Sequence, residues 1–265
     1  MTLSLGLDGR IVLVTGGVRG VGLGITAAFL AAGATVVTCS RTEPDSVPAG
    51  ATWRPLDVRD AAAVNHLVAE IVADHGRLDV LVNNAGGAPY ADAAEASPRF
   101  HAKIVELNLL APLILAQAAN TVMQDQPEGG VIVNVSSVSA LRPSPGTAAY
   151  GAAKAGLDSL TRSLAVEWAP KVRVNAIDVG MVRTEQTDLH YGGATGVSAI
   201  EATVPLGRLA TPRDVGNVAA FLASSLAAYV SGATLEVHGG GEAPAFLAAA
   251  RSAVEPVETH PKENK

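Results

Sequence analysis

Short runs of β-branched residues alternate with helical segments along most of the chain. The first run, Arg10–Thr15, precedes a predicted helix over Val21–Ala32, and this order recurs as far as a last strand at Ala233–Val237. Strands that alternate with helices pair in parallel through right-handed crossovers, and the helices then cover both faces of the sheet. The sequence therefore predicts an α/β fold: a single doubly wound parallel sheet, Rossmann-like, in three α/β/α layers.

The same pattern predicts the position of each element. The predicted strands are Arg10–Thr15, Ala34–Ser40, Thr52–Leu56, Leu78–Val82, Val131–Val135, Lys171–Ile177 and Ala233–Val237. The predicted helices are Val21–Ala32, Asp60–Gly76, Pro98–Gln124 with an interruption at Pro112, Ala148–Trp168 and Asp214–Ser224. We expect one domain over residues 1–242, which includes a substrate lid at 185–203, and a C-terminal extension over 243–265 with a short helix and a frayed tail.

Composition narrows the class of protein. The net charge of −6 includes no block of like charge, which argues against a nucleic-acid partner or a polybasic membrane surface. Cys39 is the single cysteine, which fits a reducing compartment, and no secretory signal or membrane-length apolar stretch is visible. The histidines lie far apart in the sequence, so we predict no metal site. These features predict a cytoplasmic protein.

A glycine-rich turn follows the first strand. The segment Thr15–Gly22 reads TGGVRGVG and opens the first predicted helix. Glycines there allow a sharp turn and a close approach to a pyrophosphate, and the helix N-terminus offers free N–H groups. The spacing differs from the standard G-x-G-x-x-G fingerprint. Taken alone, the segment is also compatible with an ordinary turn.

Two further motifs lie at or beyond strand ends. Asn83–Gly86 reads NNAG after the fourth strand, and it could be no more than an asparagine-rich turn. Tyr150 and Lys154 share one helix face at i and i+4, a spacing that many helices contain by chance. Ser137 ends the fifth strand, 13 residues before Tyr150.

In this order, the motifs resemble the short-chain dehydrogenase/reductase family, from about Leu7 to Gly241. The resemblance implies that Tyr150 is the general acid/base, Lys154 its activator, Ser137 the donor that orients a carbonyl, and Asn108 part of a proton relay. The chemistry agrees, since a free tyrosine has a pKa of about 10 and needs a nearby cation to exchange protons near neutrality. Pro112 has no N–H and removes the i+4 donor to the Asn108 carbonyl, so this acceptor could serve the relay. Alternatively, Asn108 caps a helix that starts near Pro112.

The cofactor preference follows from the end of the second strand. NAD-specific enzymes usually carry an acid there, whereas this chain has Ser40 and Arg41, with Arg19 in the glycine turn as a second cation. We therefore predict NADP(H), with NAD(H) possible, since both arginines could simply be solvated. The other predicted cofactor-binding residues are Gly16, Gly20, Val21, Gly22, Asp57, Val58, Asn84, Ala85, Gly86, Tyr150, Lys154, Gly180, Val182 and Thr184.

The chain departs from the family pattern after the sixth strand. Val179 stands where a proline is usual, Asp178 where a small residue is usual, and His238 where an aspartate is usual. Tyr90, Leu141, Pro143 and Met181 are candidates to line the substrate pocket.

We predict an NADP(H)-dependent reductase of a small ketone, or a dehydrogenase of the corresponding secondary alcohol. Possible substrates are 3-oxoacyl, steroid-like or other small carbonyl compounds. The resemblance implies a homotetramer, or a homodimer. The alternatives are an NAD-dependent alcohol dehydrogenase, a dehydratase or epimerase on the same fold, and a non-catalytic dinucleotide-binding regulator.

Overall fold

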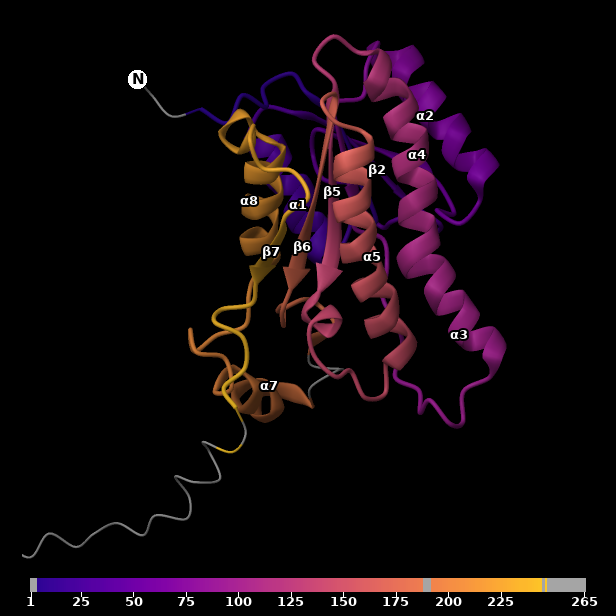
Figure 1. Ribbon diagram of the computed structural model, residues 1–265. Coiled ribbons are helices and arrows are strands. Elements are labelled where there is room, and N and C mark those ends of the chain that lie inside the picture. Colours follow the sequence, from indigo (N-terminus) through magenta and orange to yellow (C-terminus); the bar gives the residue numbers. More distant parts are fainter. Residues whose placement is uncertain (1–3, 188–191, 245, 247–265) are drawn as a thin grey trace, which may run out of the picture.

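The central sheet has seven parallel strands in the order β3-β2-β1-β4-β5-β6-β7 (Figure 1). The computed structural model describes residues 4–187, 192–244 and 246. The strands are β1 (Ile11–Thr15), β2 (Thr35–Ser40), β3 (Ala51–Pro55), β4 (Val80–Asn83), β5 (Gly130–Ser137), β6 (Val172–Val179) and β7 (Thr234–Val237). The strand order reverses between β1 and β4, and ligands of doubly wound sheets bind at such a switch point. The predicted fold class is confirmed.

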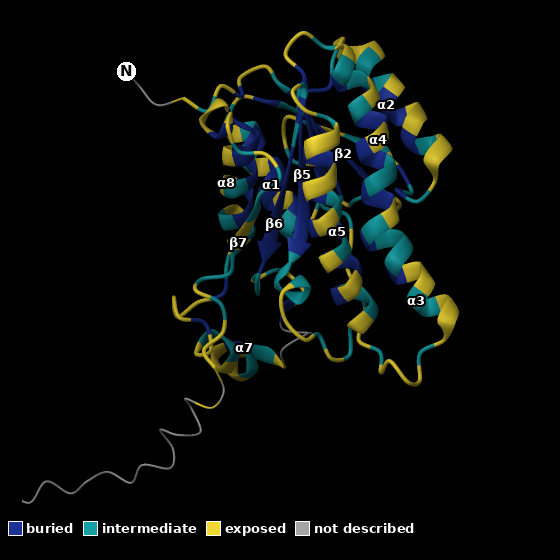
Figure 2. Cartoon of the chain, in the orientation of Figure 1, coloured by how far each residue is buried: buried dark blue, intermediate teal, exposed yellow. Residues whose placement is uncertain are grey.

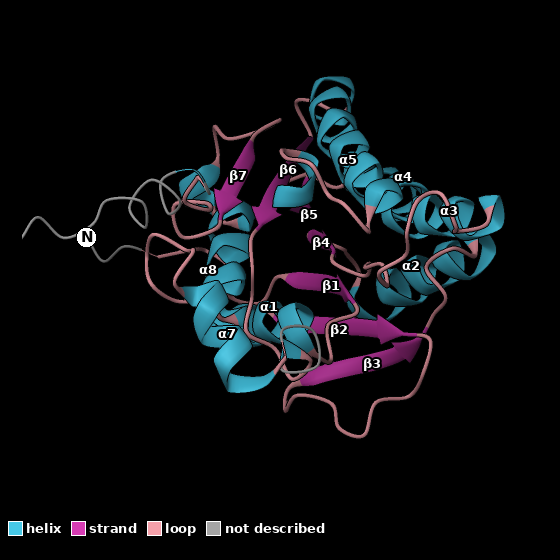
Figure 3. Cartoon of the chain, turned by 90° about the horizontal axis from the view of Figure 1, so that it is seen from below, coloured by secondary structure: helices cyan, strands magenta, loops and turns pink. Residues whose placement is uncertain are grey.

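Helices cover both faces of this sheet, as the view onto the strand ends in Figure 3 shows. On one face lie α1 (Gly20–Ala31) and α8 (Pro212–Ala223), and on the other lie α2 (Ala61–His75), α4 (Ala111–Asp125) and α5 (Ala148–Glu167). Each face has its own apolar core, and the central strands β1 and β4 are buried along their whole length. The neighbouring strands β5 and β6 are likewise mostly dark blue, the colour of buried residues, in Figure 2. Burial on both faces explains why β1 and β4 are continuous apolar runs.

Side chains cap some of the helix starts. Asp60 accepts the backbone N–H groups of Ala62 and Ala63 at α2, and Thr211 forms a capping box with Asp214 at α8. Helix α1 differs, because its N-cap residue Arg19 makes no side-chain cap hydrogen bond. The first N–H groups of α1 are therefore left for a ligand or for solvent.

The helical region around Pro112 differs from the prediction. Helix α3 (Pro98–Val105), a π-helical segment (Glu106–Leu110) and α4 follow one another without a break, so Asn108 does not cap a new helix. Pro112 cannot donate an N–H to the Asn108 carbonyl, and the chain accommodates this loss by widening one turn rather than by ending the helix. By length and composition alone this region could span a membrane, but α4 packs against β4 and β5 as a core helix does.

Two other boundaries shift in ways that matter for the site. Strand β6 continues to Val179, two residues beyond the predicted end, which places Asp178 inside the sheet rather than in a turn. The weakly periodic stretch Thr184–Thr203 contains a helix, α7 (Gly193–Glu201), beyond the carboxyl ends of the strands (Figure 1). Residues 188–191 of the predicted lid, and most of the extension 243–265, lie outside the described residues.

Candidate active site

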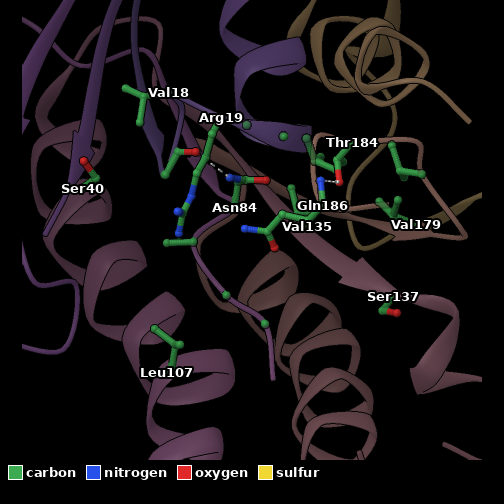
Figure 4. Close-up of a pocket in the computed structure, with 18 of the residues that line it drawn as sticks. Val18, Arg19, Ser40, Asn84, Leu107, Val135, Ser137, Val179, Thr184 and Gln186 are labelled. Carbon is green, nitrogen blue, oxygen red and sulfur yellow. Dashed lines mark hydrogen bonds between the residues drawn. The ribbon is translucent and has the colours of Figure 1, made fainter. Parts of the chain in front are cut away.

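A cleft of about 960 Å³ opens at the carboxyl ends of the strands. Its size is in the range of small-molecule and cofactor sites. Every predicted site residue lines it except Asn108, which is fully buried behind Gly87. Figure 4 shows Ser40 and Ser137 toward opposite sides of this cleft, with Arg19 and Asn84 between them. The structure therefore brings together residues from distant parts of the sequence.

The glycine turn has the geometry that a close ligand requires. Gly16 and Gly20 have positive φ angles of 66° and 50°, which disfavour any residue with a side chain. A Cβ on Gly22 would lie 2.1 Å from the Gly16 carbonyl oxygen, so only glycine fits there. Together with the uncapped start of α1, this turn fits the pyrophosphate of a dinucleotide.

The NNAG segment holds this turn in place. The Asn84 amide Nδ2 donates to the carbonyl oxygens of Thr15 and Gly16, at 2.8 and 3.3 Å. The Thr15 hydroxyl accepts the backbone N–H groups of Asn84 and Ala85, at 3.0 and 2.9 Å. The sequence did not single out Thr15 as a site residue. Its place at the end of β1, beside the end of β4, could have indicated this role.

Asn108 supports the floor of the cleft from behind. Its Oδ1 accepts the Gly87 N–H at 2.8 Å, and its Nδ2 donates to the carbonyl oxygens of Gly87 and Ile104, at 3.0 and 2.9 Å. A Cβ on the preceding residue, Gly86, would lie 2.7 Å from Asn108 Oδ1 and 3.5 Å from Lys154 Nζ. Asn108 therefore fixes the loop that separates it from Lys154.

Tyr150 and Ser137 face each other at one end of the cleft, next to the end of β5. Burial raises the pKa of Tyr150, while a hydrogen bond with the Ser137 hydroxyl lowers it. The Ser137 Oγ accepts the Ser139 N–H at 3.2 Å and caps the short helix Val138–Ala140. In this contact Oγ is only an acceptor, so its proton is left for the Tyr150 oxygen or for a ligand oxygen.

Lys154 lies one helical turn after Tyr150 and is buried. Its Nζ donates to the Val135 carbonyl at 2.7 Å and lies 5.6 Å from the centroid of the Tyr150 ring. Burial lowers the pKa of Lys154 to about 8, against the attraction of Asp158 and Asp178, which raises it. Lys154 is thus cationic below about pH 8, and a cation this close favours the phenolate form of Tyr150.

The other end of the cleft combines charges of both signs. Arg19 and Arg41 are exposed at its wall, and Glu43 and Asp45 line the same region. Ser40 is engaged within the protein, since its Oγ donates to the Thr42 carbonyl at 2.7 Å and accepts the Trp53 indole N–H at 2.8 Å.

Asp57 is also engaged within the protein. The Arg59 guanidinium bonds both of its carboxylate oxygens, at 2.9 and 2.6 Å, and this hydrogen bonding lowers the pKa of Asp57 to about 2. The carboxylate therefore remains charged at neutral pH.

The three departures from the family pattern also have defined places. Asp178 is fully buried in β6, and Val179 and Gly180 line the cleft. His238 packs against Gly180 and forms a 2.5 Å contact with Glu236. Of the predicted substrate contacts, Met181 lines the cleft, whereas Tyr90 and Leu141 are largely exposed. Among the described residues no group of three or more His, Cys, Asp or Glu side chains could hold a metal ion.

Comparisons with known proteins agree with this geometry. A family model described as Enoyl-(Acyl carrier protein) reductase matches residues 16–242. The chain is 34% identical to a 3alpha-hydroxysteroid dehydrogenase of Mediterraneibacter gnavus over 88% of the chain and 97% of that protein. The chain belongs to the short-chain dehydrogenase/reductase family. It is an oxidoreductase of the short-chain alcohol dehydrogenase type, and the family uses a nicotinamide cofactor.

Two further relatives show the breadth of this family. A galactitol 2-dehydrogenase of Agrobacterium fabrum is 32% identical over 88% of the chain and 98% of that protein. The structure of an aldohexose dehydrogenase from Thermoplasma acidophilum superposes with a TM-score of 0.84 at 28% identity, over 90% of this chain and 96% of that one. These relatives are named for a steroid, a polyol and a sugar, so family membership alone leaves the substrate open.

Proposed function

We propose that the protein interconverts a small ketone and the corresponding secondary alcohol, with NADP(H) as the preferred cofactor. The observation that carries the proposal is the convergence of Ser137, Tyr150 and Lys154 at one end of the cleft. The glycine turn and the uncapped start of α1 lie at the same cleft and fit a dinucleotide pyrophosphate. The cofactor would be held by this turn, by Asn84–Gly86 and by Gly180–Thr184, and when bound it supplies or accepts the hydride.

Each residue then has a defined part in the reduction. The Ser137 hydroxyl donates a hydrogen bond to the carbonyl oxygen of the substrate, which stabilises the negative charge that develops there. The Tyr150 hydroxyl transfers its proton to that oxygen. The Lys154 ammonium stabilises the phenolate left on Tyr150, because it lies close to the ring in a site where burial weakens solvent screening. Oxidation of the alcohol reverses these steps, with Tyr150 as the base.

The preference for NADP(H) is supported by Arg19 and Arg41. Both guanidinium groups are exposed at the wall of the cleft, where a 2′-phosphate would form charge-assisted hydrogen bonds. Ser40 would contribute through its backbone or its remaining acceptor capacity, since its hydroxyl proton is donated to Thr42. The opposite preference has its own support, because Glu43 and Asp45 line the same region and could accept the ribose hydroxyls of NAD(H).

A titration followed by nicotinamide fluorescence separates these two preferences. We expect NADPH to bind at least about tenfold more tightly than NADH, a difference of about 1.4 kcal/mol. The variant Arg41→Ala should weaken NADPH binding and leave NADH binding almost unchanged, because only NADPH carries the phosphate. The matched control Arg54→Ala removes an arginine that pairs with Asp74 away from the cleft and should change neither affinity. Tighter binding of NADH by the unmodified protein would contradict the preference for NADP(H).

The finer features of the proposal rest on the family. We propose a homotetramer, or a homodimer, located in the cytoplasm, acting on a 3-oxoacyl, steroid-like or other small carbonyl substrate. Analytical ultracentrifugation tests the assembly, and a panel of ketones with NADPH tests the substrate class.

A further inference from the structure

A row of polar side chains crosses the face of the sheet beneath α5. Ser136 of β5 lies in register with Asp178 of β6, and Asp178 lies in register with Glu236 of β7. Residues in register on neighbouring parallel strands point to the same face, and Asp158 of α5 covers this row from above. Asp178, Ser136 and Asp158 have exposed fractions of only 0%, 3% and 5%.

The two buried aspartates are poorly partnered for buried charges. Both carboxylate oxygens of Asp178 and the Oδ1 of Asp158 have no hydrogen-bond partner within the described part of the chain. The Ser136 hydroxyl lies near both carboxylates, but it makes a long bond of 3.4 Å to the Lys154 carbonyl. A buried carboxylate without a partner is costly, and two that face each other cannot both be ionised cheaply.

The physical environment of the pair favours one bound proton. Burial, together with the negative charges of Asp158 and Glu236, raises the pKa of Asp178 to about 6, while the nearby Ser136 hydroxyl and Ser137 N–H lower it. Burial also raises the pKa of Asp158, while the hydrogen bond with Ser136 and the positive charges of Arg162 and Lys154 lower it. Such coupled carboxyl groups titrate as a pair, with a first and a second proton, rather than as two separate acids.

The pair faces the catalytic end of the cleft. Asp158 lies one helical turn after Lys154, and both carboxylates attract the Lys154 ammonium. The negative charge of Asp178 also raises the pKa of Tyr150. On the side of β7, Glu236 faces Asp178 and is itself in contact with His238.

We propose that Asp158 and Asp178 share one proton beneath Lys154 in mild acid and, once both are ionised, hold Lys154 in the ammonium form that the Lys154–Tyr150 pair needs. The two aspartates are positioning residues, because they act through Lys154 and Tyr150. The consequence for catalysis rests on the proposed function of that pair. Above the pH at which this proton is lost both carboxylates are charged, and their negative charge favours the ammonium form of Lys154.

The shared proton can be tested without any turnover. Aspartate labelled with ¹³C at its side-chain carboxyl is incorporated into the full chain, and each resonance is titrated by NMR between pH 4 and 9. We expect one carboxyl with a midpoint near pH 6, above the ordinary value of about 3.9. In Asp158→Asn the midpoint of Asp178 should fall by at least about one unit, because the like charge is gone. The control Asp125→Asn replaces an exposed carboxylate at the end of α4 and should leave that midpoint unchanged.

The second readout is the pH dependence of reduction. Asp158→Asn removes a charge that favours the Lys154 ammonium, so the fall in rate expected above about pH 8 should move to lower pH by about one unit, with little change in the KM for the ketone. Asp178→Asn should remain as stable as the parent at pH 8, because it removes a carboxyl group whose ionisation opposes folding as the pH rises through 6.

The outcomes separate the two proposals. Midpoints that are both ordinary, or that ignore substitution of the partner, overturn the shared proton whatever the activity. A shared proton in a protein that turns over no ketone refutes the proposed function instead. A coupled pair whose substitution leaves the pH profile unmoved overturns the proposed effect on Lys154.

Discussion

Asn108 offers a sharp test of how the site is built, through the variant Asn108→Ala. Its buried amide makes three hydrogen bonds, of 2.8, 3.0 and 2.9 Å, to the backbone of Gly87 and Ile104. At about 1 kcal/mol for each neutral bond, the variant should lose about 3 kcal/mol of unfolding free energy. For a chain of this size each kcal/mol lowers Tm by roughly 2–4 °C, so we expect Tm to fall by roughly 6–12 °C.

The assay is thermal unfolding followed by circular dichroism, with the rate of ketone reduction measured well below Tm. The rate should fall as well, because the loop between Asn108 and Lys154 loses its support. The matched control is Asn120→Ala on α4, whose side chain is half-buried and accepts one bond from Gln124. It should cost about 1 kcal/mol or less and leave the rate unchanged. If Asn108→Ala melted within about 1 °C of the parent, the account of the loop would be wrong.

Two further predictions concern the glycine turn and pH. Gly22→Ala should abolish cofactor binding in a fluorescence titration, because its Cβ would lie 2.1 Å from the Gly16 carbonyl oxygen. The control Gly76→Ala, where a Cβ meets nothing within 4 Å, should lower stability alone. Unchanged cofactor binding by Gly22→Ala would refute the fit of the glycine turn to a pyrophosphate. The rate of ketone reduction should fall as the pH rises above about 8, because the Lys154 ammonium then loses its proton and no longer stabilises the Tyr150 phenolate; a rate that stays constant between pH 7 and 9.5 would contradict this role.

The sequence was sufficient for the fold because the two strongest signals are local. Continuous apolar strands such as β1 and β4 require burial on both faces, and the helices between them require a parallel sheet. The glycine turn and the Tyr150–Lys154 pair were also found from local spacing. The structure then placed all of these residues at one cleft.

Other features depend on three-dimensional contacts that spacing does not reveal. The π-helical segment before Pro112 is a compromise between a missing N–H and the packing of α4, and the sequence suggested only an interruption. Thr15 and the Asp158–Asp178 pair depend on which strands and helices lie side by side. Val179 extends β6 because its partner Val237 continues the ladder, and the absence of a proline at this position permits that bond pattern.

The central claim is that Tyr150 carries the proton in an oxidoreductase site, and Tyr150→Phe tests it most directly. Removing one hydroxyl should lower the rate of NADPH-dependent ketone reduction by about 10²–10⁴-fold, the usual range for a general acid. The affinity for NADPH in the fluorescence titration should change by less than about threefold, since a phenylalanine ring keeps the packing at the cleft. Full activity in this variant would contradict the account, because the proton would then come from another group.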